Sequence, residues 1–477
     1  MTQTSKHQNP PLTAIILAAG KGTRMKSPLP KVLHPVAGQP MILRSIQAAQ
    51  GAGATEVRLV VGHGQNLVRK VVESTGAQCF EQTDQLGTAH AVKCAQIDDL
   101  EGEVLIMNGD HPLVEPADLK IIAESFRELR ADLAVVTALV EKPAEMGRII
   151  RQKGVLKAIV EARDASAETL KITEINTGFY MMKAQVLKEL LPEIKNENSK
   201  GEYYLTDLVT LAQGKGFSVQ ALETNSRVAH GVNTQAELAF ATRQAFRKKA
   251  EDMMDEGVLI LDPDSVYVEA AAKVGAGSVL YPNVFIRGRS EIGSFSVLEP
   301  QVFISDSTVG QSVQIRQGSY IEKTEIHSNC SVGPYARLRP ETVLHEEVHI
   351  GNFVEVKKSV IGKKSKAAHL AYLGDAEIGE ECNIGCGVIT VNYAADRKKY
   401  KTKVGNKVFV GSDVQLIAPI EISDEAVLGA GSTITKPVPA RALAVARGRQ
   451  VNIENYTPKS RETESDKEVK ASDAKKE

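Results

Sequence analysis

Aliphatic residues recur at every sixth position over much of the C-terminal half of the chain. The series are Val268, Val274, Leu280, Ile286, Ile292, Leu298 and Ile304; Val309, Ile315 and Ile321; Ile326, Val332, Leu338, Leu344, Ile350 and Val356; and Val404, Val410, Leu416, Ile422, Leu428 and Ile434. A period of six fits neither a helix nor a simple alternating strand. It is typical of a hexapeptide β-helix, in which each six-residue unit forms one flat side and three sides make a coil of about 18 residues. The pattern predicts a triangular β-prism of roughly ten coils.

The predicted prism has a narrow interior, and the composition agrees with this. The chain contains no Trp, and aromatic residues make up 5% of it. One polar and charged stretch, TVNYAADRKKYKT at 390–402, interrupts the pattern. We interpret this stretch as an external loop of one coil, because it is polar and charged within an otherwise regular pattern. Loops on a rigid scaffold often carry function.

The N-terminal half shows a different pattern, in which apolar strand-like runs alternate with amphipathic segments. The runs are TAIILA, VRLVV, VLIMNGD, LAVVTALV, INTGFYMM and FSVQALE, and the segments between them include MILRSIQAAQGAG and TAHAVKCAQI. Buried runs separated by helices predict a mainly parallel sheet covered on both faces, as in Rossmann-like α/β folds. Such sheets bind ligands beyond the carboxyl ends of their strands.

These patterns divide the chain into four segments. Residues 1–234 form the α/β domain. Residues 235–257 form a connecting helix, because Ala, Leu, Phe and Met recur there at helical spacing up to a Gly. Residues 258–456 form the all-β prism. The charged tail 457–477 has almost no aliphatic residues, and we expect it to be disordered.

Charge and cysteine content exclude several classes of protein. The 58 Lys and Arg nearly balance the 59 Asp and Glu, which gives no argument for nucleic acid or an anionic membrane as partner. No apolar run reaches the length of a membrane span, and the polar start lacks the apolar region of a secretory signal. The five cysteines form no CxxC pair and indicate reduced thiols. We therefore expect a cytoplasmic protein.

The stretch LAAGKGTRMKSPLPK at 17–31 follows the first strand-like run and suits phosphate binding. Gly20 and Gly22 allow backbone N–H groups to approach an anion closely. Lys21, Arg24 and Lys31 can hold a triphosphate and its leaving pyrophosphate. The alternative interpretation is a surface loop with solvated charges.

Both halves carry motifs of one family. The 17–31 stretch resembles the signature loop of sugar-1-phosphate nucleotidyltransferases, and further motifs of that family follow in order: QLGTAHA, NGD, GR at 147–148, EINTG and GEYYLTD. The C-terminal half contains ARLRP, GNFVEVKKS, GKKSKAAHLAYLGDAEIGEECNIG and FVGSDVQLIAP. From about residue 13 to 450 the chain resembles the bifunctional bacterial N-acetylglucosamine-1-phosphate uridyltransferase/glucosamine-1-phosphate N-acetyltransferase family.

This resemblance implies a nucleotidyltransferase domain followed by a left-handed parallel β-helix of hexapeptide repeats. It also implies four substrates: glucosamine 1-phosphate, acetyl-CoA, N-acetylglucosamine 1-phosphate and UTP. The products of the second step are UDP-N-acetylglucosamine and pyrophosphate. By the same resemblance, UDP-N-acetylglucosamine feeds peptidoglycan and lipopolysaccharide precursors.

For uridylyl transfer the resemblance implies Mg²⁺ held by Asp110 and Asn233, with Lys31 and Arg24 in catalytic roles. Asp110 is a hard oxygen ligand at a predicted strand end, although a lone Asp there can also be structural. The remaining positions implied to face UTP or the sugar nucleotide are Leu17, Ala18, Ala19, Gly20, Gln82, Gly87, Thr88, Asn108, Gly109, Gly147, Glu161 and Asn176. The family usually has an aromatic residue where this chain has Asn108.

For acetyl transfer the resemblance implies His369 as the proton acceptor. Imidazole titrates near neutral pH and suits this role. Glu355 is a candidate to orient or charge-stabilise it. The positions implied to hold glucosamine phosphate are Arg339, Lys357, Tyr372, Asn383 and Lys399, and those for acetyl-CoA are Cys386, Asn392, Tyr393, Ser412, Ala430 and Arg447. The family commonly reads NYDG where this chain has the longer NYAADRKKYKT, so Lys398 is an alternative to Lys399.

The flat sides of such β-helices pack threefold, and we therefore expect a homotrimer. Two rival interpretations differ in function. One is a hexose-1-phosphate uridylyl- or thymidylyltransferase whose β-helix only assembles the trimer. The other is a non-enzymatic subunit of a translation-factor exchange complex. The acetyltransferase set disfavours the first, and the presence of Lys31 and Asp110 disfavours the second.

Overall fold

The computed structural model describes residues 9–198 and 201–456. The chain divides into two compact units, Met1–Thr324 and Glu325–Glu477, which are described separately. The tail predicted to be disordered, 457–477, lies outside the described residues. The predicted division at residues 234 and 258 is a different one, based on changes in the sequence pattern, and it stays a prediction.

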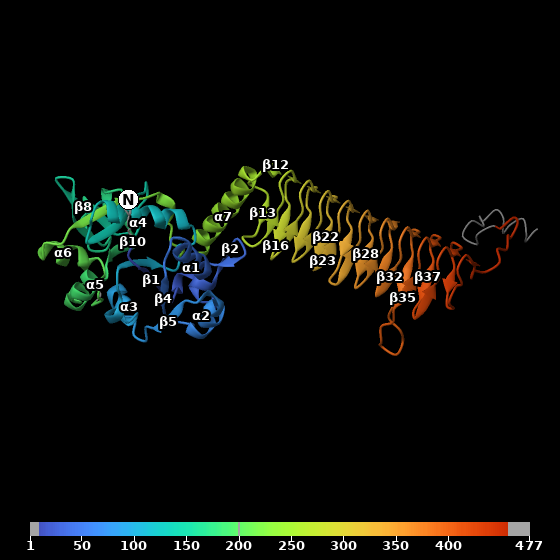
Figure 1. The fold of residues 1–477 in the computed structure, drawn as a ribbon, viewed down its shortest axis with the longest axis horizontal. Coiled ribbons are helices and arrows are strands. Elements are labelled where there is room, and N and C mark those ends of the chain that lie inside the picture. The colour runs from blue at the N-terminus through green and yellow to red at the C-terminus, as the bar shows by residue number, and fades with distance from the viewer. Residues whose placement is uncertain (1–8, 199–200, 457–477) are drawn as a thin grey trace, which may run out of the picture. The chain divides into compact units, whose positions relative to one another are not determined.

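A mixed sheet forms the centre of the first unit (Figure 1). Its strand order is β11-β7-β10-β6-β1-β4-β5, with β8 and β9 attached as a hairpin beside β10. All neighbours pair in parallel except β10, which is antiparallel to β6 and β7, and the β8–β9 hairpin. The strands are β1 (Leu12–Ala18), β4 (Glu56–Val61), β5 (Gln78–Glu81), β6 (Glu103–Asn108), β7 (Leu133–Leu139), β8 (Arg148–Gln152), β9 (Val155–Val160), β10 (Glu174–Lys183) and β11 (Val219–Glu223). The six predicted strand runs and the mainly parallel sheet are confirmed.

Helices cover both faces of this sheet, because its apolar side chains alternate between two cores. Ile16 and Leu59 belong to one core, and Ile15 and Val60 belong to the other. The helices are α1 (Met41–Gly51), α2 (Gln65–Val72), α3 (Thr88–Cys94), α4 (Pro116–Glu128), α5 (Ala184–Leu190) and α6 (Asp207–Gly214). Short elements complete the domain: β2 (Pro35–Val36), β3 (Gln39–Pro40), and 3-10 turns at Thr23–Met25, Lys31–Leu33, Glu73–Thr75, Ile97–Asp99, Thr169–Lys171, Leu191–Glu193 and Ser226–Ala229.

A long helix, α7 (Gln235–Asp255), lies where the connecting helix was predicted. The Thr234 side chain accepts a hydrogen bond from the Glu237 backbone N–H, and the Glu237 carboxylate accepts one from the Thr234 backbone N–H. This capping box satisfies donors that the first turn leaves free. Near the middle of this helix, the Phe246 ring packs edge-on against Tyr267 of the first coil, with centroids 5.3 Å apart.

The first unit also contains the first coils of a parallel β-helix. Its strands stack as β12-β15-β18-β21, β13-β16-β19-β22 and β14-β17-β20. Outside the prism, Tyr267, Phe285, Phe303 and Tyr320 form a ring stack along one side. The strands are β12 (Leu259–Ile260), β13 (Tyr267–Val268), β14 (Lys273–Val274), β15 (Val279–Leu280), β16 (Phe285–Arg287), β17 (Glu291–Ile292), β18 (Val297–Leu298), β19 (Phe303–Ser305), β20 (Thr308–Val309), β21 (Gln314–Ile315) and β22 (Tyr320–Glu322).

The second unit consists of further coils with the same three-sided stacking: β24-β27-β30-β33-β36-β39-β41, β25-β28-β31-β34-β37-β40 and β26-β29-β32-β35-β38. Its strands are β23 (Thr324–Ile326), β24 (Ser331–Val332), β25 (Arg337–Leu338), β26 (Thr342–Leu344), β27 (His349–Asn352), β28 (Glu355–Lys357), β29 (Val360–Ile361), β30 (Lys366–His369), β31 (Tyr372–Gly374), β32 (Ala376–Ile378), β33 (Asn383–Ile384), β34 (Ile389–Val391), β35 (Thr402–Val404), β36 (Phe409–Val410), β37 (Gln415–Ile417), β38 (Ile420–Ile422), β39 (Val427–Leu428), β40 (Thr433–Ile434) and β41 (Leu443–Ala444). The fold class, an α/β domain plus a left-handed parallel β-helix, is confirmed.

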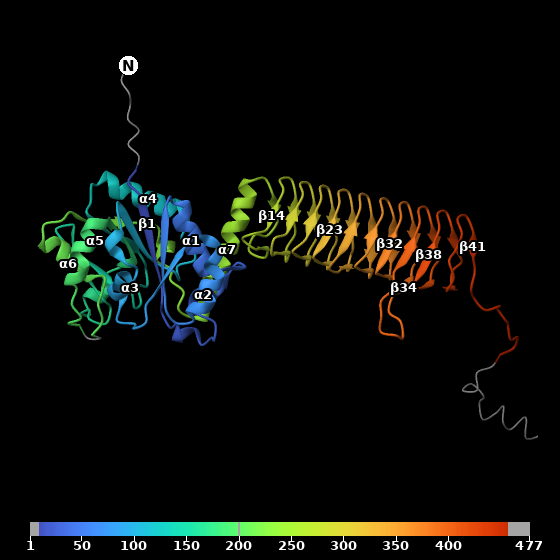
Figure 2. The ribbon, with the colours of Figure 1, turned by 60° about the horizontal axis from the view of Figure 1, so that its bottom comes forward.

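Every aliphatic residue of the six-residue series is buried, from Val268 to Ile434. The interior of the prism is therefore formed by the residues that the sequence period selected. The predicted loop also exists: between β34 and β35 the chain leaves the prism and returns (Figure 2). Tyr393 pairs with Lys399 in an antiparallel bridge, so this loop is a small hairpin.

Among the helices of the described residues, none combines the length and apolar character needed to cross a membrane. All five cysteines are free thiols, as predicted.

Candidate active sites

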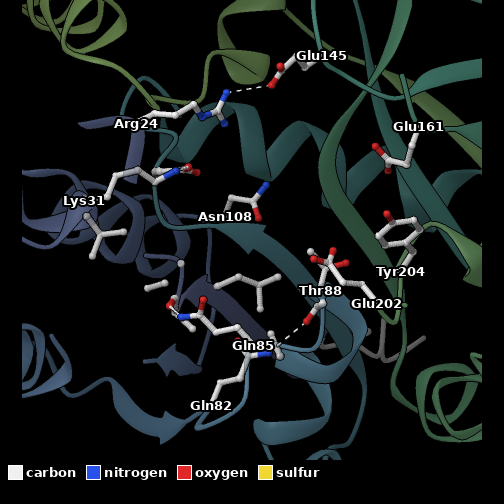
Figure 3. Close-up of a pocket in the computed structure, with 18 of the residues that line it drawn as sticks. Arg24, Lys31, Gln82, Gln85, Thr88, Asn108, Glu145, Glu161, Glu202 and Tyr204 are labelled. Atoms are coloured by element: carbon white, nitrogen blue, oxygen red, sulfur yellow. Dashed lines mark hydrogen bonds and ion pairs between the residues drawn. The ribbon is translucent and has the colours of Figure 1, made fainter. Parts of the chain in front are cut away.

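A cavity of about 510 Å³ opens at the carboxyl ends of β1 and β6 in the first unit (Figure 3). Most residues predicted to face the nucleotide line it. They are Leu17, Ala18, Ala19, Gly20, Arg24, Lys31, Gln82, Gly87, Thr88, Asn108, Asp110 and Glu161. This is the edge of the sheet where α/β folds bind ligands.

The glycine-rich loop after β1 is shaped by two different requirements. A Cβ on Gly20 would have no heavy atom within 4 Å, so its backbone is open to a ligand. Gly22 has a φ of +61°, and a Cβ there would lie 2.7 Å from the Lys31 Cβ. Gly22 therefore lets the loop fold back onto Lys31, as a side chain at this position would prevent close approach.

Lys31, Asp110 and Asn233 meet in a network at the cavity floor. The Lys31 Nζ donates to Asp110 Oδ2, and it donates to Asn233 Oδ1 at 2.9 Å. Burial favours the neutral form of Asp110, but Lys31 and His111 outweigh this effect, so the pKa of this carboxyl lies below its ordinary value. Residues more than 100 positions apart in the sequence thus share one cation.

This network passes a simple test for a hard metal ion. One carboxylate oxygen and one amide oxygen already contact the same positive charge, the Lys31 ammonium. Oxygen ligands of these two types suit Mg²⁺. Asp110 and Asn233 could hold such an ion if Lys31 turned toward a phosphate.

At the rim of the cavity, Arg24 forms an ion pair with Glu145 at 3.0 Å (Figure 3). Both side chains are well exposed, with 57% and 71% of their surfaces accessible. An exposed pair of this kind contributes little to stability. The Arg24 guanidinium can therefore exchange Glu145 for an anionic ligand at small cost.

The opposite wall comes from the loop before α3, which packs against the segment 201–207. A Cβ on Gly87, whose φ is +113°, would lie 2.5 Å from the Tyr203 carbonyl oxygen. The Thr88 hydroxyl accepts a hydrogen bond from the Leu205 backbone N–H at 3.0 Å. Two of the quoted motifs, QLGTAHA and GEYYLTD, are thus held together by their backbones.

Four predicted residues lie beside the cavity rather than in its lining. Asn233 is part of the Lys31 network, and Gly109 donates its N–H to the Leu17 carbonyl at 2.9 Å. Asn176 donates its backbone N–H to the Gly147 carbonyl at 2.9 Å. A Cβ on Gly147 would lie 3.6 Å from the Glu161 carboxylate, so this pair borders the wall that Glu161 forms.

Asn108 lines the cavity and fills a narrow space. A Cβ on Gly178 would lie 2.5 Å from the Asn108 Nδ2. The side chain of Asn108 therefore lies against the backbone of Gly178, where a residue larger than glycine would not fit. Figure 3 shows the Asn108 amide pointing into the cavity.

Several lining residues were missed by sequence reasoning. They are Val32, Gln85, Ala91, Glu145, Ala162, Arg163, Glu202 and Tyr204. Gln85 donates to the Ala19 carbonyl at 2.6 Å and so joins the QLGTAHA segment to the phosphate loop. Gln85 and Tyr204 lie within motifs quoted above, and those motifs were the available signal.

In the second unit, the predicted acetyl-transfer residues follow one corner of the prism. The residues that directly precede the left-handed turn of successive coils are Asn352, His369, Cys386, Ser412 and Ala430, and the turn residues are Phe353, Leu370, Gly387, Asp413 and Gly431. We call the first set the corner column. Arg447, from the last coil, donates to the Ala430 carbonyl at 3.0 Å. Stacking thus brings together residues spread over the sequence.

His369 has a partner that differs from the expected one. Its Nδ1 lies 3.0 Å from Asn352 Oδ1, and the two residues are register neighbours in β30 and β27. Glu355 instead accepts a hydrogen bond from the Arg339 guanidinium at 2.8 Å. Asn352 contacts the imidazole because it occupies the equivalent position one coil earlier. That Glu355 orients or charge-stabilises His369 stays a prediction.

Three cations gather at the next corner of the same coils. The pKa of Lys357 is lowered, first because the Lys399 side chain lies against it and further by partial burial and by Arg339. Like charges held together in this way favour an anion between them. Lys398, the alternative, belongs to the hairpin turn, where its backbone N–H donates to Asp396. The structure brings Lys399 to this cluster.

Polar groups lie on the flat face between His369 and the cations. Tyr372 is the register neighbour of Glu355, and its hydroxyl lies 3.4 Å from the Asn392 Nδ2. Asn392 is buried and also donates to the Asp375 carboxylate. Asn383 is exposed one coil further on, beside Lys366, but it belongs to β33 and so lies on the neighbouring side of the prism, the one that contains β30. Tyr393 begins the hairpin that carries Lys399.

These features define a class of protein. Residues 14–172 match the MobA-like NTP transferase domain family, and residues 263–352 match the GMPPB C-terminal domain family. The first unit is therefore a nucleotidyltransferase, and the same chain carries a β-helix with its own cluster of catalytic-type side chains.

Relatives that match nearly the whole chain specify the family. The bifunctional protein GlmU of Bdellovibrio bacteriovorus is 63% identical over 96% of this chain and 100% of its own length. Those of Pelobacter propionicus and Trichlorobacter lovleyi are 45% and 44% identical, over 93% and 94% of this chain and 98% of their own lengths. The chain belongs to the GlmU family of bifunctional proteins, and the predicted family is confirmed.

Proposed function

We propose that the chain makes UDP-N-acetylglucosamine in two steps. An acetyl group passes from acetyl-CoA to the amine of glucosamine 1-phosphate. A uridylyl group then passes from UTP to N-acetylglucosamine 1-phosphate, and pyrophosphate leaves. The observation that carries this proposal is that each unit has its own cationic site. In the first unit Lys31 lies beside Asp110, a pair that suits uridylyl transfer. In the second unit Lys357 and Lys399 lie at the corner next to that of His369, which suits acetyl transfer.

In the uridylyl step, a phosphate oxygen of N-acetylglucosamine 1-phosphate attacks the α-phosphorus of UTP. A new P–O bond forms while the bond to pyrophosphate breaks. Two anions must meet, so the site needs positive charge and positioning more than a base. Lys31 and Arg24 supply that charge when they exchange Asp110 and Glu145 for phosphate oxygens.

Asp110 and Asn233 are the residues of this chain that fit Mg²⁺, since both already direct an oxygen at one cation. When bound, the ion supplies charge neutralisation at phosphate oxygens. The low pKa of Asp110 keeps this carboxyl ionised and ready to act as a ligand.

In the acetyl step, the sugar nitrogen attacks the thioester carbonyl, a C–N bond forms, and the C–S bond to CoA breaks. The attacking nitrogen must lose a proton, which His369 accepts. Because Asn352 Oδ1 accepts a hydrogen bond, the His369 Nδ1 carries the hydrogen and its Nε2 is left to take the proton. The CoA thiolate leaves, and the corner column toward Arg447 provides a surface for CoA.

The cluster of Arg339, Lys357 and Lys399 would hold the phosphate of glucosamine 1-phosphate. Its binding would neutralise the repulsion that lowers the pKa of Lys357. Tyr372 and Asn392 would contact the sugar and the acetyl group from the face between the cations and His369, and Asn383 would do so from the neighbouring face. We also propose that the protein works as a homotrimer in the cytoplasm and supplies cell-wall precursors.

One assay with two readouts tests the proposal. Purified protein is mixed with glucosamine 1-phosphate, acetyl-CoA, UTP and Mg²⁺, and free CoA thiol and pyrophosphate are followed together. We expect both to be released, with pyrophosphate depending on acetyl-CoA. If N-acetylglucosamine 1-phosphate replaces glucosamine 1-phosphate, pyrophosphate should no longer need acetyl-CoA.

Two other outcomes would contradict parts of the proposal. Thiol release without pyrophosphate would show that the chain does not carry out uridylyl transfer, and Asn108 would be the first residue to examine as the cause. Pyrophosphate from N-acetylglucosamine 1-phosphate, with no thiol release in any mixture, would remove the acetyl activity and direct attention to the hairpin at 392–402.

A further inference from the structure

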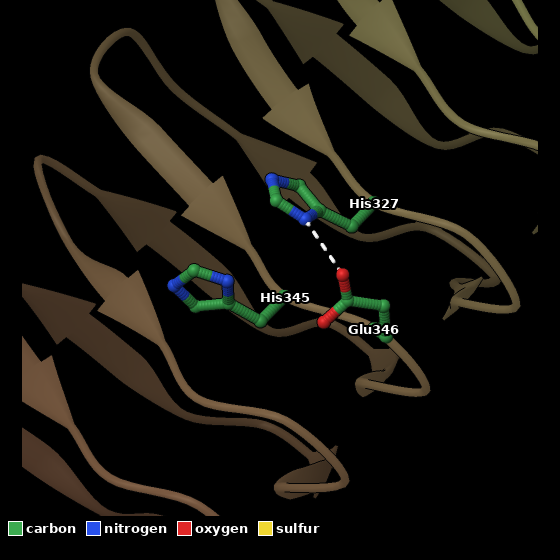
Figure 4. A group of neighbouring side chains, drawn as sticks. All are labelled: His327, His345 and Glu346. Atoms are coloured by element: carbon green, nitrogen blue, oxygen red, sulfur yellow. Dashed lines mark hydrogen bonds and ion pairs between the residues drawn. The ribbon is translucent and has the colours of Figure 1, made fainter.

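Two histidines and a glutamate that belong to neither proposed site meet on the outside of the β-helix. His327 follows β23 and His345 follows β26, one coil later, with Glu346 next to His345 (Figure 4). One potential ligand atom from each residue lies within 4.8 Å of the others. The two imidazole rings meet edge to face with centroids 5.0 Å apart.

The two histidines occupy equivalent positions in neighbouring coils. The backbone N–H of His327 donates to the Leu344 carbonyl at 2.8 Å, and the backbone N–H of His345 donates to the Ile361 carbonyl at 3.0 Å. The next three coils have glycine at this position: Gly362, Gly379 and Gly405. A Cβ on Gly362 would lie 2.5 Å from the carbonyl group of Gly379. Two large side chains at this crowded position are therefore not ordinary coil packing.

The polar atoms have the spacing of metal ligands. His327 Nδ1 lies 3.2 Å from Glu346 Oε1. Two ligands of a tetrahedral Zn²⁺ at about 2.0–2.1 Å from the ion lie roughly 3.3 Å apart. The other ring nitrogen of His327, Nε2, lies 3.0 Å from Glu325 Oε1. An outer carboxylate on the far nitrogen is the arrangement that orients metal-binding imidazoles.

We propose that His327, His345 and Glu346 bind one divalent transition-metal ion of the zinc class and join two neighbouring coils. The imidazole nitrogens favour Zn²⁺, Co²⁺ or Ni²⁺ over Mg²⁺, which separates this site chemically from the oxygen ligands Asp110 and Asn233. His327 and Glu346 expose 29% and 44% of their side chains, so an ion can enter from solvent and water can complete its coordination. Glu325 acts as a positioning residue.

The test measures metal binding by the full-length, untagged protein in excess Mg²⁺, which occupies oxygen sites. Equilibrium dialysis with Zn²⁺ gives the stoichiometry, and visible absorption with Co²⁺ reports the coordination. We expect His345→Gln and Glu346→Gln to bind one equivalent less than the unchanged protein and to lose the corresponding Co²⁺ bands. Glu325→Gln should keep the stoichiometry and weaken the affinity roughly 10–100-fold.

His349→Ala is the matched control, because His349 lies in the same coil but on another side. It should bind like the unchanged protein, and other thiol or histidine sites cancel in the comparison. Equal stoichiometry and affinity in the unchanged protein, His345→Gln and Glu346→Gln would overturn the proposal. Circular dichroism establishes that each variant is folded, and His327→Gln provides a second ligand variant if one is not.

Discussion

At the scale of single residues, each proposed chemical group depends on partners from other elements of the fold. Asp110 is matched by Lys31 and Asn233, His369 by Asn352, and Lys357 by Lys399. In each case the partner changes the charge or the hydrogen position that the chemistry needs.

Replacing Asp110 should separate the two activities. Asp110→Asn keeps the side-chain shape but removes the negative charge that balances Lys31 and suits Mg²⁺. We expect uridylyl transfer to fall by about 100-fold or more, as for other lost electrostatic groups. Acetyl transfer should be unchanged. Pyrophosphate and thiol release, measured on the same preparation, check both, and a parallel loss of acetyl transfer in a folded variant would contradict independent sites.

The same carboxyl gives a pH dependence with a defined sign. Its pKa is lowered in the folded chain, so its contribution to stability is present above the unfolded pKa and is lost as pH falls through the folded pKa. Between pH 5 and 8, Asp110 should therefore stay ionised. Mg²⁺ affinity should be flat in this range, which titration calorimetry can check; a steep fall between pH 7 and 5 would contradict the assignment.

His369 and Asn352 should differ in the kind of effect that they produce. His369→Ala should lower the rate of acetyl transfer by roughly 10²–10⁴-fold, because it removes the proton acceptor. Asn352→Ala leaves the base but frees its orientation, so the loss should be smaller and the pH profile should shift. The pH dependence of kcat/KM distinguishes these effects, and an unshifted profile in Asn352→Ala would reduce Asn352 to packing.

Lys357→Ala should weaken the binding of glucosamine 1-phosphate. A hydrogen bond to a charged group contributes about 1.5–3 kcal/mol, which corresponds to roughly 10–100-fold in KM. Lys358→Ala is the control, since Lys358 pairs instead with Glu341 at 3.0 Å. Steady-state kinetics with acetyl-CoA saturating give both KM values. Equal values for the two variants would exclude the proposed phosphate cluster.

At the scale of elements, the sequence predicted the scaffold better than the contacts on it. The six-residue period identified the buried residues of the prism because one position in six must point inward. It carried no information on side chains outside, whose neighbours lie one coil away in sequence. The Asn352–His369 contact, the His327–His345 pair and the hydrogen bond between Arg339 and Glu355 were missed for this reason.

The first site shows the same division. Strand ends and glycines located the cavity, because ligands bind at that edge of a parallel sheet. Glu145 and Arg163 were not found, although each lies two residues from a predicted position, because both are in loops without a helix or strand pattern to indicate their direction. Gln85 was within reach of sequence reasoning, as it begins one of the quoted motifs.

One element-level prediction concerns the loop before α3. Gly87 has φ +113° and ψ 178°, a region that only glycine adopts readily, and it touches the Tyr203 backbone. Gly87→Ala should destabilise this loop by about 1–3 kcal/mol and weaken UTP binding. Gly214→Ala is the control, because a Cβ added at Gly214 would have no heavy atom within 4 Å. Calorimetric unfolding and UTP titration measure the two effects, and no difference from the control would contradict the packing argument.

At the scale of the whole molecule, the acetyl-transfer face is open in a single chain. Apolar side chains next to the corner column are exposed, including Phe353 at 58% and Leu370 at 60%. Exposed apolar groups beside a proposed site favour an interface. We expect sedimentation to give the mass of a trimer, and Leu370→Glu to lower both trimer content and acetyl transfer. A monomeric mass with acetyl transfer intact would contradict this prediction.

The corner column also has a consequence for how such a chain changes over evolutionary time. Along it, 17 residues separate His369 from Cys386, and 26 separate Cys386 from Ser412. The additional residues form the hairpin outside the prism, and the stacking of the coils is unaffected. Insertions between β34 and β35, at the corner where the cations gather, can therefore alter how a substrate is bound without a compensating change in any inward-pointing residue. New specificities are accessible here by changes in length alone.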